Sequence, residues 1–470
     1  MIRKSIVTLG LVVTAIIFLA GLAQPAAAQA QNSQPTYTIP EYNAFEAAQT
    51  EKDPATQIKL LDDFVAKYPN STLLPYVYEL YYPAYQRTRN YAKAIEYADK
   101  VVALGDKVDD LAKLQALSVR VIAFSQAFNP KAQDAHDQLV KQRDAADQGA
   151  KLLAALPKGK NQANMTDAEW DAQKKPGLSL FYSSAAYADF LLKDYAAAIP
   201  EFKSAIAANP NDAVSWYRIG VSYLGSTPPA YMDGFWALAR AINLKIPGDS
   251  KVKDYLKGQI TAYEQPGCDT SVDAQLSELL QLAGTTGDRP ATYKIPSAAD
   301  LTQIRQASNI LSLISDLSAG GDKAKMTWLA LCGAQFPEVV GKIIDVVPGD
   351  GYVDFMVYTG ATDDDIQKAT TANMDVKVQT GVPAAAGAAG AAAAPAAAEP
   401  AAGQAPPAGP QPDVLRLQKD DGIRFAGTVS SFDPNPFLLH WSDVKVDPTI
   451  IPEKQEEGKH HHVSTKHSGK

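Results

Sequence analysis

Residues 180–210 read LFYSSAAYADFLLKDYAAAIPEFKSAIAANP and decide the fold. Tyr195 opens a second helix, and Asn209-Pro210 ends it. Between them small and large apolar residues follow at helical spacing, at Ala198, Phe202 and Ala205. A new first helix begins at once, with side chains at the same spacing at Trp216, Ile219, Gly220 and Tyr223. The pattern therefore predicts a stack of helix pairs.

This order of residue types resembles the tetratricopeptide repeat: aromatic, large apolar, small and aromatic in the first helix, then small, large and small in the second, closed by Pro. The resemblance implies a superhelix, in which small residues let paired helices approach and large ones fill the neighbouring hole. The second-helix pattern recurs upstream at Tyr91, Ala94 and Ala98, and again at Ile58, Leu61, Phe64 and Tyr68-Pro69. A longer pair is predicted over 111–156. We expect the repeat domain to span 31–265.

A helical extension is expected over 266–336, with amphipathic stretches at 272–282 and 298–317. After Pro337 apolar and polar residues alternate instead of following helical spacing, which predicts a small β-domain over 337–447. Its expected strands cover 339–346, 352–358, 374–379, 423–430 and 437–446, with a tight turn at 348–351. Five strands in this order suggest a small barrel or rolled sheet of the oligonucleotide- and oligosaccharide-binding (OB) type. Residues 422–429 and 436–439 also resemble the β-domain that ends some exported bacterial repeat proteins.

Two segments are expected to stay disordered. Residues 381–412 interrupt the β-domain and are almost wholly Ala, Pro and Gly, so they bury too little surface to offset their ordering entropy. A helical alanine tract is the alternative, which the interspersed Gly and Pro disfavour. The charged tail, 448–470, carries most of the histidines.

The N-terminus predicts export. Arg3 and Lys4 precede an apolar run over 6–23, and small residues follow to Ala30, so 1–30 is typical of a signal peptide cleaved after Ala28 or Ala30. The alternative is an uncleaved anchor, since the run nearly reaches the ~18 residues of a spanning helix. We expect a periplasmic or secreted protein, whose membrane contact is limited to an uncleaved signal or a partner.

Only two cysteines are present, Cys268 and Cys332. In an oxidising compartment an even pair predicts a disulfide. Cys332 follows an apolar run, however, so a buried free thiol is the alternative.

The composition argues against nucleic acid and against catalysis. The net charge of −8 is the wrong sign for a phosphate backbone. Four of the six histidines lie in the tail, at His460, His461, His462 and His467, which leaves His136 and His440 for the folded body. No phosphate loop, dinucleotide fingerprint, nucleophile elbow or paired-His zinc helix is present. Thr362 before three aspartates at 363–365 favours a capped helix over a calcium loop. We therefore expect no catalytic residue, metal or cofactor.

Tyrosines crowd one predicted first helix, with Arg87 at its end. In a repeat superhelix the first helices line the concave face, where Tyr and Arg commonly anchor partners. The repeat register assigns Tyr78, Tyr81, Tyr82 and Tyr85 to packing. It predicts that the groove is lined by Tyr76, Glu79, Gln86, Arg87, Ser183, Tyr187, Tyr217 and Val221.

The sequence thus predicts a non-catalytic scaffold that binds a protein or peptide partner of the cell envelope. One alternative is a glycan-binding β-domain, which would need aromatics such as Phe432, Phe437 and Trp441 exposed on one face of the barrel. An enzyme is a second alternative, which the shortage of histidines disfavours. The oligomeric state cannot be derived from the sequence.

Overall fold

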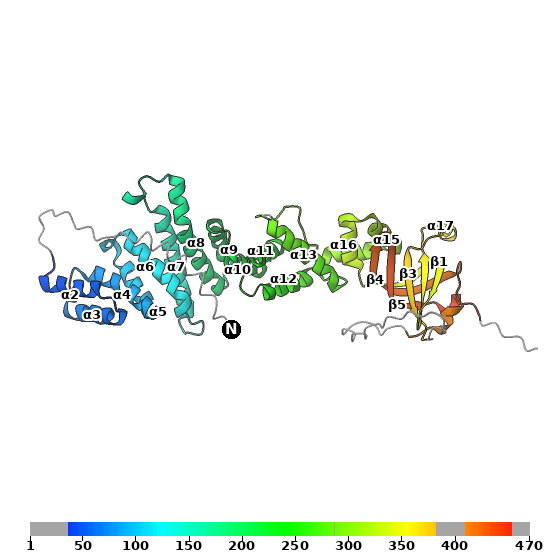
Figure 1. Cartoon of the computed structure of the whole chain (residues 1–470), viewed down its shortest axis with the longest axis horizontal. Coiled ribbons are helices and arrows are strands. Elements are labelled where there is room, and N and C mark those ends of the chain that lie inside the picture. The colour runs from blue at the N-terminus through cyan, green and yellow to red at the C-terminus, as the bar shows by residue number, and fades with distance from the viewer. Residues whose placement is uncertain (1–35, 286, 382–408, 454–470) are drawn as a thin grey trace, which may run out of the picture. The chain divides into compact units, whose positions relative to one another are not determined.

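The computed structural model describes residues 36–285, 287–381 and 409–453. The predicted signal peptide, nearly all of the Ala/Pro/Gly segment and the His-rich tail lie outside those residues. The chain divides into two compact units, Met1–Leu256 with Ser277–Lys294, and Lys257–Leu276 with Ile295–Lys470. Figure 1 shows their elements. Within the described ranges, no helix is both long and apolar enough to cross a membrane.

Unit 1 is built from consecutive helix pairs, each helix packing on its neighbour in the chain (Figure 1). Its helices are α2 (Ile39–Thr50), α3 (Pro54–Lys67), α4 (Leu74–Arg87), α5 (Tyr91–Ala103), α6 (Asp110–Ala127), α7 (Ala135–Ala155), α8 (Asp167–Leu192), α9 (Tyr195–Ala208), α10 (Ala213–Gly225) and α11 (Tyr231–Asn243). The chain then passes between the units within α12 (Asp249–Glu264) and returns within α13 (Asp269–Thr285).

Side chains cap the start of several helices of unit 1. Asp194 accepts the backbone N–H of Ala197 at the start of α9, and Asp212 does the same for Ser215 in α10. Such caps satisfy donors that the first turn of a helix leaves unpaired. The break between α9 and α10 at Asn209-Pro210 lies where the sequence predicted it.

Small residues set the distance between paired helices. A Cβ added to Gly220 of α10 would stand 2.9 Å from Leu238 Cγ and 3.1 Å from the Gly234 carbonyl oxygen on α11. Ala198 and Phe202 of α9 are fully buried in the adjoining core. The close approach and the filled hole are those that the repeat pattern implied.

Unit 2 joins three helices and a β-barrel around one core (Figure 1). Leu313 and Leu317 pack in the same buried cluster as Phe355 and Phe425. The predicted stretch 298–317 is two helices rather than one, because Asn309 caps a new helix by accepting the Ser312 N–H. The elements are α14 (Ala298–Ala307), α15 (Ile310–Ala319), α16 (Gly321–Leu331), β1 (Gln335–Pro348), β2 (Tyr352–Tyr358), α17 (Asp363–Lys368), β3 (Met374–Gln379), β4 (Gly422–Pro434) and β5 (Phe437–Val446).

The five strands close into a barrel in the order β1-β2-β3-β5-β4, with β4 pairing back on β1. All pairs are antiparallel except β3–β5, which is parallel. The inward side chains of β2 alternate with outward ones, as the sequence pattern required. The predicted fold class, a mainly helical repeat followed by a small C-terminal barrel, is confirmed.

Candidate functional site

The four predicted groove residues of α4 do not share one environment. Tyr76 is 54% exposed and lies against the edge of Phe45, with the ring centroids 6.4 Å apart. Glu79 is half-buried, and burial, with a contribution from Asp109, raises its pKa to about 7. Gln86 is half-buried as well.

Arg87 is exposed, but two of its donors bind acceptors of the first helix pair. Its guanidinium donates to the side chain of Gln57 on α3 and, at 3.2 Å, to the Lys52 carbonyl oxygen. The buried Gln57 amide in turn donates to the Ala48 carbonyl oxygen of α2, at 2.9 Å. Arg87 therefore ties α4 to the first helix pair, and two of its five N–H donors are engaged within the protein.

Three of the tyrosines assigned to packing, Tyr78, Tyr81 and Tyr85, lie against the ring of Tyr97 on α5. Tyr81 is 1% exposed, and its ring lies 3.9 Å from that of Tyr97, measured between centroids. Tyr85 stacks on both rings. The tyrosines of α4 therefore pack this helix against α5.

The structure brings two of the predicted residues, Tyr187 of α8 and Tyr217 of α10, close to Arg218, which the sequence did not indicate. The Arg218 guanidinium of α10 lies over the ring of Tyr187 of α8, with Cζ 3.7 Å from the ring centroid. Tyr217 is close enough to act on Arg218 electrostatically. We define the α8–α10 face as a set of five half-buried residues: Ser183, Tyr187, Tyr217, Arg218 and Val221.

Arg218 has no acceptor of its own. Among the described residues, no carboxylate lies within ion-pair distance of the guanidinium and no oxygen accepts a hydrogen bond from it. Asp212 acts on it electrostatically, but its Oδ1 accepts the backbone N–H groups of Val214 and Ser215 at 3.0 and 3.2 Å. Burial lowers the pKa of Arg218. A guanidinium stays charged nevertheless, so the face carries an unpaired positive charge.

Aromatic side chains continue from this charge along the neighbouring helices. Tyr187 of α8 lies against the guanidinium. Tyr255 of α12, 38% exposed, interacts electrostatically with Tyr217, and burial is the main cause that raises the pKa of Tyr255. Ser183 contributes little polarity, because its hydroxyl donates to the Leu180 carbonyl oxygen of its own helix. The face is therefore aromatic, with one cation.

A signal for Arg218 was present in the sequence. It is the sole charged residue of α10, whose sequence is AVSWYRIGVSYLG. The repeat pattern identifies packing positions, so it gives no information on a charged residue such as Arg218 that lies between two of them. A search for lone charges in otherwise uncharged helices would have found it.

A second polar cluster lies between α7, α8 and α9. Asp189 occupies the position that Tyr223 holds one repeat later, and it is 1% exposed. Its Oδ1 lies 3.7 Å from Arg143 Nη1. Burial raises the pKa of Asp189 to about 6 and, with Asp147 and Asp189 nearby, that of Glu201 to about 8.

Within the described residues of the barrel, Phe432, Phe437 and Trp441 do not form the exposed aromatic face that glycan binding would need. Trp441 is 4% exposed and packs edge-on against Phe425 inside the barrel. Phe432 and Phe437 are partly buried, and Phe432 lies against Trp328 of α16. The outer surface instead carries His440, whose Nδ1 is 3.0 Å from Asp375 Oδ2 and whose Nε2 is 3.1 Å from Asp433 Oδ2.

Metal-ligand geometry is not found in the described parts of the chain, where no group of three His, Cys, Asp or Glu side chains is placed to hold an ion. Asp363, Asp364 and Asp365 form the first turn of α17, capped by Thr362, as the sequence predicted.

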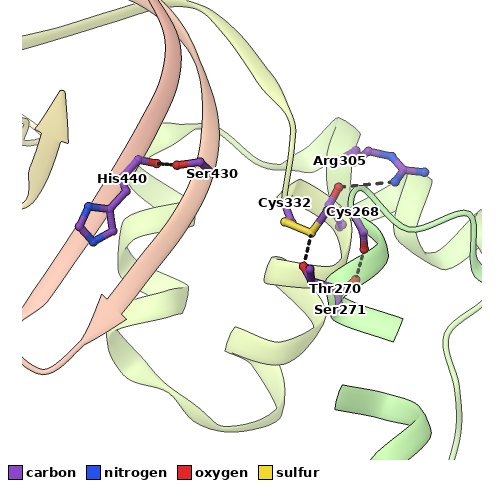
Figure 2. The surroundings of a disulfide bond; sticks show 8 residues. Cys268, Thr270, Ser271, Arg305, Cys332, Ser430 and His440 are labelled. Carbon is purple, nitrogen blue, oxygen red and sulfur yellow. Dashed lines mark hydrogen bonds between the residues drawn. A yellow bond between two sulfur atoms is a disulfide. The ribbon is translucent and has the colours of Figure 1, made fainter. Parts of the chain in front are cut away.

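Figure 2 shows the remaining candidate pair, Cys268 and Cys332, joined in a disulfide. Their Cα atoms are 5.6 Å apart, within the range of natural disulfides. Close packing surrounds them: a Cβ on Gly267 would overlap the Cys332 carbonyl oxygen, and the Gly267 N–H donates to the Leu329 carbonyl oxygen at 3.1 Å. Arg305 donates to the Ala330 carbonyl oxygen at 3.5 Å. The bond fastens the loop before α13 to the junction of α16 and β1.

No family model matches the sequence. No curated protein matches it either. Among solved structures, the chain is similar to the C-terminal part of a TPR repeat-containing protein from Cytophaga hutchinsonii, at 16% sequence identity and a TM-score of 0.23. That similarity covers 52% of this chain and 91% of the other. The fold assignment rests on the helix pairs and the barrel described above.

Proposed function

We propose that this chain is an exported, non-catalytic scaffold that binds an extended segment of a protein partner along the α8–α10 face. The observation that carries the proposal is the unpaired guanidinium of Arg218, held against Tyr187 and beside Tyr217. Rigid aromatic side chains and arginine are the groups that dominate binding energy at protein interfaces. Superhelices of helix pairs offer extended concave surfaces for this use.

The export part of the proposal rests on different features. The N-terminal 30 residues have the charge, apolar run and small residues of a signal peptide. Cys268 and Cys332 lie in disulfide geometry, and such bonds persist in oxidising compartments.

The docking proposal is tested by site-specific photo-crosslinking. A crosslinking amino acid at Tyr217 of the full-length protein should capture one partner segment from a solubilised envelope extract. The same group at Lys151, exposed on α7, is the control and should not capture that segment. A synthetic peptide of the captured segment should lose at least about tenfold in affinity for Tyr187→Ala and for Tyr217→Ala. Equal capture from both positions, or unchanged affinity in both variants, would contradict docking on this face.

A further inference from the structure

Within the proposed function, on which this inference depends, we propose that Arg218 binds the carboxylate of an aspartate or glutamate inside the docked segment. A guanidinium presents five N–H donors in a planar fork that matches a carboxylate. In this protein one face of that plane is covered by Tyr187, while the donors at its edges have no acceptor among the described residues.

The chain does not supply the missing anion. Arg218 is the sole charged residue of α10. The acid nearest in sequence, Asp212, has its Oδ1 engaged by two backbone N–H groups and its Oδ2 by the Ser215 hydroxyl at 2.6 Å. By contrast, the buried Arg120 of α6 is paired with Asp99, at 2.7 Å. A half-buried charge without a partner costs stability, and a bound anion would recover that cost.

Two features favour a carboxylate within a peptide over a phosphate or a chain terminus. A single cation on a protein of net charge −8 is a weak site for a doubly charged phosphate, whereas it matches one carboxylate. Aromatic side chains adjoin the guanidinium at Tyr187 on α8 and Tyr217 on α10, and Tyr217 interacts in turn with the exposed Tyr255 on α12. A peptide that binds Arg218 through its acid can therefore also place apolar residues against these rings, which a lone phosphate cannot do.

The free protein provides a test that needs no ligand. If Arg218 serves binding, its replacement by leucine removes an unpaired charge and keeps apolar contact with Tyr187, so the melting temperature should stay the same or rise by a few degrees. If Arg218 instead holds α8 on α10, Arg218→Leu should melt several degrees lower, which would overturn the inference.

Binding is tested with the full-length protein and peptides selected from a random linear library displayed on phage. Peptides selected on the parent should share an internal Asp or Glu between apolar residues. Replacing that acid by its amide, or using Arg218→Gln, should each weaken binding at least about tenfold. Combining the amide peptide with Arg218→Gln should weaken binding little more than either change alone, because both remove the same ion pair. Lys151→Gln, which removes one exposed positive charge on α7, is the matched control and should bind like the parent.

The outcomes separate this inference from the proposed function. Peptides that need Tyr187 and Tyr217 but bind equally well with Gln at position 218 or without their acid would overturn the inference and leave docking intact. Peptides that bind only through a free C-terminal carboxylate would also contradict the recognition of an internal aspartate or glutamate. If no selected peptide depends on Tyr187 or Tyr217, docking on the α8–α10 face fails and the inference fails with it.

Discussion

At the residue scale, Glu201 of α9 lies beside two more carboxyl groups, Asp147 and Asp189. Glu201 Oε2 and Asp189 Oδ1 are buried and accept no hydrogen bond among the described residues. Burial, followed by the two neighbouring acids, raises the pKa of Glu201 to about 8. Its ordinary value is 4.5, so the folded protein keeps a proton that the unfolded chain releases.

The difference between the folded and unfolded pKa of Glu201 makes the stability of unit 1 depend on pH. Because the folded pKa is raised, the contribution of Glu201 to stability is full below about pH 4.5 and is lost as the pH rises through about 8. Glu201→Gln, which cannot ionise, should stabilise unit 1 by about 2–4 kcal/mol at alkaline pH and have little effect at acid pH. Urea unfolding at both pH values measures the difference. Glu46→Gln, at an exposed glutamate of α2, is the control. An equal effect at the two pH values would rule out the titration.

The sequence predicted residue types better than residue environments. Tyr187 and Tyr217 were assigned to the groove by register, and the structure places them around one guanidinium. Arg87 was assigned to the same groove, but its donors reach Gln57 and Lys52. The repeat register predicts the direction in which a side chain leaves its helix. The hydrogen bonds of a long side chain also depend on acceptors in another helix pair, which the register does not predict.

At the scale of elements, the seam between β3 and β5 closes the barrel with a short register. The parallel register has three pairs: Met374 with Leu439, Asp375 with His440, and Val376 with Trp441. His440 links the seam to β4 as well, through Asp433. Burial alone lowers the pKa of His440, but the hydrogen bonds to Asp375 and Asp433 outweigh it and raise the pKa above 6.5.

We predict that this seam weakens as His440 loses its proton. The folded pKa is raised, so the stabilising contribution is full below about pH 6.5 and is lost as the pH rises through the folded value. His440→Gln should destabilise the barrel by about 1 kcal/mol at slightly acid pH and by less at alkaline pH. Hydrogen exchange of the β3 and β5 amides, followed by mass spectrometry, reports on the seam. His136→Gln, at an exposed histidine of α7, is the control. Faster exchange of equal size at both pH values would contradict an ionic seam.

Strand positions were predictable from the sequence, and strand pairing was less so. Alternation predicted 352–358, 374–379 and 437–446, which are the observed bounds of β2, β3 and β5. It placed the start of β1 four residues late, because Gln335 and Phe336 pair with β4 across a bulge that breaks the alternation. The parallel β3–β5 pair depends on chain path, which periodicity does not encode.

At the scale of the whole molecule, the sequence predicted a repeat, a helical extension and a β-domain in series. The structure divides the chain differently, since α14 to α16 share a buried core with the barrel. Apolar periodicity indicates that a helix has a buried face, but the element that covers this face is decided by tertiary packing. Two cysteines far apart in sequence indicated where such packing brings the chain together.

The disulfide closes a loop whose ends are 64 residues apart, which in the chain-entropy model stabilises the folded state by on the order of 4 kcal/mol. The double variant Cys268→Ser, Cys332→Ser should lower the urea midpoint of unit 2 and leave that of unit 1 unchanged, because the bond lies within unit 2. Protein recovered from its native envelope and denatured should take up a thiol-alkylating reagent only after reduction, which a mass shift reveals. Alkylation without reduction would show free thiols, and it would count against both the bond and export to an oxidising compartment.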